Sequence, residues 1–96
     1  MSFTNQSIED FLSKHRIVYK PMKILHTDMK GFAYYKNNVY LVVVNKKYIR
    51  YQMELYADII DILRNNFIYD NEDKNLHCKN ITKIVKTLEE LIKNNS

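Results

Sequence analysis

Three carboxylates have a spacing that acid–base chemistry can use. Glu54, Asp58 and Asp61 lie four and then three residues apart, so on a helix they share one face. Two such groups can act as general acid and general base. No histidine or nucleophile is identifiably placed to work with them, and we interpret them as the solvated stripe of an amphipathic helix.

The other reactive side chains are few and scattered. His77 and Cys78 are adjacent, but no second Cys-x-x-Cys or His-x-x-x-His pair accompanies them as a zinc site would require. A single glycine is too few for a phosphate-binding loop, and no local signature places a base beside Ser7, Ser13 or Cys78. The sequence predicts a protein that is not an enzyme, with no catalytic residue, no metal and no cofactor.

Basic side chains gather in the first half of the chain. Residues 1–50 carry nine Lys or Arg against three Asp or Glu, whereas residues 51–96 carry six against eight. Tyrosines interleave with these lysines over residues 19–51. Such a surface attracts either a phosphate backbone or an acidic protein surface. Neither an RNP-like signature nor a helix-turn-helix pattern is present, so a protein partner is our first hypothesis and nucleic acid the alternative.

We expect the partner to bind where a hairpin leads into a helix. A positive surface that carries a tyrosine supplies both electrostatic steering and an aromatic anchor. The predicted partner-binding residues at this strand–helix junction are Lys36, Tyr40, Lys46, Lys47 and Arg50.

The hairpin itself is the clearest element. Two β-branched and aromatic runs, residues 32–36 and 39–44, meet at Asn37-Asn38, and Asn tolerates the left-handed conformation of a tight turn. The only glycine, Gly31, closes the preceding turn, where a positive φ is expected. The second run is apolar on both faces. We therefore expect a central strand that is covered on at least part of its second face.

A short helix and a short strand precede the hairpin. Ser7 is the predicted N-cap, with Thr4 as a competing cap, and the helix should end near His15. Residues 17–20 form the strand. Pro21 prevents its continuation as a central strand, although residues 22–26 can resume it at an edge.

Two helices follow the hairpin. The first runs from about Ile49 to Asn66, and its apolar face is so wide that either the last helix or a second subunit must cover it. A polar, exposed connector then spans 67–79. Asn80 is predicted to cap a closing helix with an apolar stripe over 81–92, which serves as a lid on the core or as a dimerising surface.

Together these elements predict one α+β domain over residues 1–96. Its order is helix, strand, β-hairpin, long helix and closing helix, with helices packed on a three-stranded, mainly antiparallel sheet. One cysteine fits a reducing compartment. No targeting pattern begins the sequence, and no run reaches the roughly 18 apolar residues of a membrane span. We expect a cytoplasmic protein that binds no membrane. A homodimer through its second or third helix is an alternative to a monomer.

The chain also resembles a known family over residues 8–57. The similar segments are Met-Lys-Gly-Phe-Ala-Tyr-Tyr at 29–35, the strand at 39–45 and the helix entry at 46–55. They resemble the N-terminal part of the ImmA/IrrE zinc metallopeptidases, which are common in phages and mobile elements. In that family the long helix carries His-Glu-x-x-His.

The zinc motif has no counterpart here. A gapless match puts Ile59, Ile60 and Leu63 at its positions, and a shift of one residue puts Asp58, Ile59 and Ile62 there. The resemblance implies a shortened relative without the catalytic site. We therefore predict a non-catalytic regulator or inhibitor of phage or mobile-element type, with a metallopeptidase-related protein using an unrecognised active site as a further alternative.

Overall fold

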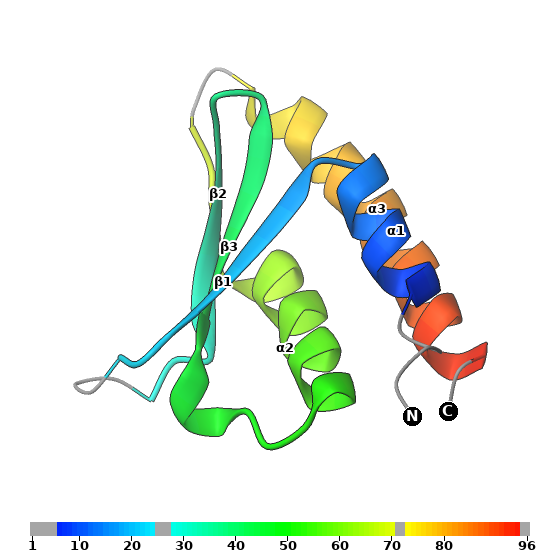
Figure 1. Cartoon of the computed structure of the whole chain (residues 1–96). Coiled ribbons are helices and arrows are strands. Elements are labelled where there is room, and N and C mark those ends of the chain that lie inside the picture. The colour runs from blue at the N-terminus through cyan, green and yellow to red at the C-terminus, as the bar shows by residue number, and fades with distance from the viewer. Residues whose placement is uncertain (1–5, 25–27, 71–72, 95–96) are drawn as a thin grey trace.

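A computed structural model describes residues 6–24, 28–70 and 73–94 of the chain. The described residues form three α-helices and four strands, which confirms the predicted α+β class. Figure 1 shows two layers, with the sheet on one side and all three helices gathered over one of its faces. The elements are α1 (Gln6–Lys14), β1 (Ile17–Met22), β2 (Gly31–Lys36), β3 (Val39–Asn45), the 3₁₀ helix η2 (Lys46–Tyr48), α2 (Gln52–Asn65), β4 (Phe67–Ile68) and α3 (Lys74–Asn94).

The sheet is four-stranded and mixed, with the order β1-β3-β2-β4. Strands β2 and β3 form the predicted antiparallel hairpin, whereas β1 pairs with β3 and β4 pairs with β2 in parallel. The prediction of three mainly antiparallel strands is therefore wrong in detail. Strand β4 has two residues, too few to show a hydrophobic alternation in the sequence.

Strand β1 runs through Pro21 and lies at the edge of the sheet. The amide of Tyr40 donates to the carbonyl of Arg16. In a parallel ladder alternate residues bond to the same neighbour, so the even-numbered positions of β1 bond to β3. Pro21 belongs to the outward set, where its missing N–H removes no ladder bond. Proline thus excludes a central position without ending the strand.

The hairpin turn and the glycine have the predicted conformations. Asn37 and Asn38 have φ of 54° and 66°, and Gly31 has φ of 151°. A Cβ at residue 31 would overlap the carbonyl oxygen of Val43 and lie 2.7 Å from Cδ1 of Ile62. Glycine is needed here because β2 passes close to both β3 and α2.

The first helix begins earlier than the predicted Ser7 cap allows. Because α1 starts at Gln6, Ser7 lies inside the helix and is not its N-cap; Thr4 falls outside the described residues. Helical spacing places Ile8 and His15 on one face, which should meet the core. Ile8 is buried, but His15 is exposed and does not meet the core.

The last helix covers the long helix. Helix α3 packs against both α2 and α1, so the wide apolar face of α2 is buried within the chain, which is one of the two alternatives that the sequence left open. The predicted stripe of α3 is confirmed by four buried side chains, Ile81, Ile84, Val85 and Leu88. The helix begins at Lys74, so Asn80 is not its cap.

Replacing Gly31 should destabilise the fold through both its φ and its close contacts. For Gly31→Ala we expect a loss of about 2–4 kcal/mol in the free energy of unfolding, measured by urea unfolding. The control Asn38→Gly places a glycine at another left-handed residue and should change stability by less than about 0.5 kcal/mol. Equal stability of Gly31→Ala and wild type would contradict the close approach of β2 to β3.

Candidate functional site

The sheet has one face that the helices do not cover. Side chains alternate along a strand, and Ala33, Tyr40, Val42 and Val44 belong to the core under the helices. Their neighbours point the other way, and all three helices lie on the opposite side of the sheet (Figure 1). We call the side chains on this side the open face: Val18, Lys20 and Met22 of β1, Phe32, Tyr34 and Lys36 of β2, Val39, Leu41 and Val43 of β3, and Ile68 of β4.

The open face is apolar and carries only basic charges. Val18 is 47% exposed, Met22 45% and Ile68 59%. The rings of Phe32 and Tyr34 stack with centroids 6.2 Å apart. Val43 of the central strand lies on this second face and is only 6% exposed, so the expected partial cover of that face is present at this position. Phe32, Tyr34, Val39 and Leu41, which lie between the exposed edge strands, are half-buried. Exposed apolar side chains gathered on one face mark interaction sites.

The structure does not bring the predicted partner-binding residues together. Lys36 and Tyr40 flank the hairpin turn at one end of β3, whereas Lys46, Lys47 and Arg50 follow its other end. The seven residues of β3 span roughly 20 Å. The expectation of a single cluster at the strand–helix junction is therefore wrong, because a full strand separates its two parts.

Tyr40 is a core residue and not a surface anchor. It is 6% exposed, and its hydroxyl accepts from Asn80 Nδ2 at 3.2 Å and lies 3.0 Å from His77 Nδ1. With Asn80 as donor, the phenol proton is free for Nδ1, which favours the His77 tautomer protonated on Nε2. Burial raises the pKa of Tyr40. His77, assigned from the sequence to an exposed connector, is buried in the structure.

The acidic stripe of α2 is also not uniformly solvated. Asp58 is 4% exposed. The Lys30 Nζ lies 3.6 Å from Asp58 Oδ1 and 3.1 Å from Asp61 Oδ2, while Asp58 Oδ2 has no hydrogen-bond partner within the described parts of the chain. Burial raises the pKa of Asp58, and the nearby Lys30 partly opposes this rise. Lys30 comes from the segment before β2, so helical periodicity alone could not reveal the contact.

These charged residues line one pocket of about 520 Å³. Three bases and three acids meet there, so the predicted basic and acidic regions share a site at the start of α2. We call it the Asp58 pocket, and its lining residues are Lys30, Lys47, Arg50, Tyr51, Glu54, Ala57, Asp58 and Asp61.

A second polar cluster ties α1 to the rest of the fold. The hydroxyl groups of Tyr19 and Tyr56 both donate to Glu9 Oε2, the first at 2.7 Å. Burial and the Glu9 carboxylate raise the pKa of Tyr19 to about 12 and also raise that of Tyr56. Both phenols therefore stay protonated as donors at neutral pH, which suits a structural role.

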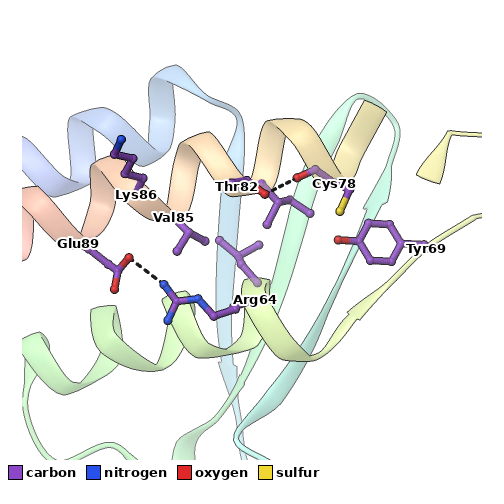
Figure 2. Close-up of a pocket in the computed structure, with 9 residues that line it drawn as sticks. Arg64, Tyr69, Cys78, Thr82, Val85, Lys86 and Glu89 are labelled. Carbon is purple, nitrogen blue, oxygen red and sulfur yellow. Dashed lines mark hydrogen bonds and ion pairs between the residues drawn. The ribbon is translucent and has the colours of Figure 1, made fainter. Parts of the chain in front are cut away.

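A smaller pocket of about 260 Å³ lies between α2 and α3 (Figure 2). Arg64 Nη2 and Glu89 Oε1 pair across it at 2.7 Å, and Figure 2 shows Tyr69 and Cys78 facing each other at its other end. Burial and Cys78 raise the pKa of Tyr69. No histidine lines this pocket, so the described residues provide Cys78 with no imidazole base.

Within the described ranges, no group of three or more His, Cys, Asp or Glu side chains is arranged to hold a metal ion. None of the described helices is long and apolar enough to cross a membrane. Comparison with protein-family models, curated proteins and solved structures finds no match. The resemblance to the ImmA/IrrE family stays a prediction. The α2 residues at its gapless motif positions, Ile59, Ile60 and Leu63, are buried in the core.

Removing the buried charge of Asp58 should stabilise the protein at neutral pH. The folded state binds the Asp58 proton more tightly than the unfolded chain does, so the free energy of unfolding falls as pH rises from the ordinary pKa of 3.8 through the raised value. Asp58→Asn lacks this titration. We expect its stability relative to wild type to rise between pH 4 and pH 7, as measured by urea unfolding.

Asp61→Asn is the matched control, since it removes the other carboxylate that contacts Lys30 at a half-exposed position. Asp61→Asn should change the pH dependence of stability less than Asp58→Asn does. An Asp58→Asn variant that loses stability relative to wild type as pH rises to 7 would contradict the assigned burial cost.

Proposed function

We propose that the chain is a non-catalytic binding protein that docks a protein partner through the open face. The observation that supports this proposal is the uncovered apolar sheet surface. Six of its ten side chains are aliphatic, and its only charged ones are Lys20 and Lys36. A fitting partner presents an apolar centre with carboxylates at its rim, because complementary charge steers encounter and fixes register.

A second copy of the chain fits this surface less well. A two-fold contact uses the same patch on both subunits, and this patch has two lysines with no acid to pair with them. The wide apolar face of α2 that suggested a helix-mediated dimer is covered by α3. Homodimerisation through α2 or α3 stays a prediction.

Nucleic acid is the second candidate, supported by the stacked pair Phe32 and Tyr34 on β2. The same face carries Lys36 of β2 and Lys20 of β1. Bases stack on such rings while lysines neutralise phosphates. Two aromatic and two basic residues among ten favour a protein partner, since nucleic-acid surfaces are much more positively charged than protein interfaces.

The biological setting follows only from the sequence. A regulator or inhibitor of phage or mobile-element type is the role that the ImmA/IrrE resemblance implies, and the single cysteine favours a cytoplasmic location. We retain both as part of the proposal. A metallopeptidase-related activity has less support, because Ile59, Ile60 and Leu63 are core residues.

Charge reversal on the open face should abolish capture of the partner. We would capture partners from the native cell with and without nuclease and then measure binding of the captured protein. For Lys20→Glu with Lys36→Glu we expect on the order of a tenfold or greater loss of affinity. The new glutamates would repel the partner's carboxylates, and the electrostatic steering by the lysines would be lost. Loss of capture only after nuclease treatment would instead establish the nucleic-acid candidate.

Two matched double variants make the comparison specific. Lys83→Glu with Lys86→Glu changes the same charge at exposed positions of α3 and should bind normally. Lys46→Glu with Lys47→Glu tests the junction predicted from the sequence and should retain binding. Should this last pair lose binding while the open-face pair keeps it, the open face is not the docking site.

A further inference from the structure

The Asp58 pocket contains a buried acceptor that the fold does not satisfy. Asp58 is the one buried side chain among the residues that line it, and that side chain is 5% exposed. Its Oδ2 finds no hydrogen-bond partner in the ranges that the structure describes. Leaving a buried charged acceptor unpaired costs the full desolvation penalty of that group. Such groups are rare enough in native proteins to require an explanation.

Lys30 does not supply the hydrogen-bond donor that the Asp58 carboxylate lacks. Its Nζ hydrogen-bonds Asp61 at 3.1 Å, whereas its 3.6 Å separation from Asp58 Oδ1 exceeds hydrogen-bond length. The three N–H donors of an ammonium diverge from one nitrogen, so they match the two oxygens of a carboxylate less well than a planar guanidinium does. The Lys30 side chain is half exposed, so an incoming cation can take its place without disturbing the core.

We propose that the Asp58 pocket binds a guanidinium group, which replaces the Lys30 ammonium and donates to both oxygens of Asp58. A guanidinium presents parallel N–H groups in a planar fork that matches a carboxylate. Tyr51, 64% exposed and part of the same pocket, offers a ring on which this plane can stack. The site lies at the start of α2 and is independent of the open face.

The charged residues around Asp58 indicate which charge a ligand should carry beside its guanidinium. Glu54 and Asp61 add negative charge beside Asp58, while Lys47 and Arg50 line the same pocket. The pocket is therefore formally balanced and suits a guanidinium that has a carboxylate near it. Free arginine and an arginine side chain of a partner protein share this chemistry.

Titration of the full chain, followed by backbone amide resonances in NMR, tests the proposal. The probes are L-arginine and N-acetyl-arginine amide, and the corresponding citrulline compounds are uncharged controls of the same shape. We expect saturable shifts at Lys30, Tyr51 and Asp58 with the arginine probes only. Tighter binding of L-arginine assigns the site to the free amino acid, and equal or tighter binding of the blocked form assigns it to a protein side chain.

Three variants separate binding from folding. Asp58→Asn should weaken binding at least tenfold, Asp61→Asn should weaken it less, and Lys30→Met should strengthen it because the competing ammonium is gone. The stronger binding expected of Lys30→Met would not occur if Asp58 had only a structural role. Absence of saturable shifts, equal binding of citrulline, or weaker binding by Lys30→Met would overturn the proposal. These outcomes hold even if Asp58→Asn fails to fold.

Discussion

One-sided burial of β3 is the constraint on which the rest of the structure depends. This strand is hydrogen-bonded on both edges, by β1 and β2, and it turns Tyr40, Val42 and Val44 into the core. Because the side-chain period of a strand is two, its other apolar set must point away from that core. All three helices pack on the first face, so the second face is left apolar and open (Figure 1).

The features that sequence patterns predict correctly are local ones. The left-handed turn at Asn37-Asn38 and the positive φ of Gly31 depend on neighbouring residues, and the α3 stripe follows from helical periodicity. The parallel pairing of β1 with β3 and of β4 with β2 depends on packing between distant segments. A two-residue strand such as β4 carries no periodic signal of its own.

The environments of polar side chains also depend on distant segments, which sequence patterns do not predict. Asp58 has the helical spacing of a solvated stripe, but Lys30 lies against it. His77 is buried because α3 begins before Asn80. Tyr40 looks like an interface residue by type, yet its strand parity turns it inward to His77. Residue types alone therefore do not define a site. The strand register must be known before residues can be assigned to the same face.

Two polar clusters differ in whether their carboxylate oxygens have hydrogen-bond donors. Glu9 receives two phenol donors and ties α1, β1 and α2 together, so its acceptor is satisfied. Asp58 keeps an oxygen without a donor in the described residues, next to a pocket. Satisfied networks of this kind specify the fold, whereas an unsatisfied group at a surface pocket is where an external ligand gains most.

A sheet face that binds a partner must be accessible to solvent in the free protein. A soluble paramagnetic agent tests this accessibility directly, because methyl protons relax faster when solvent reaches them. In the free protein, the methyl groups of Val18 and Leu41 should relax much faster than those of Val42 and Val44, which are fully buried. Equal protection of all four residues would show that the face is covered, and would contradict the account.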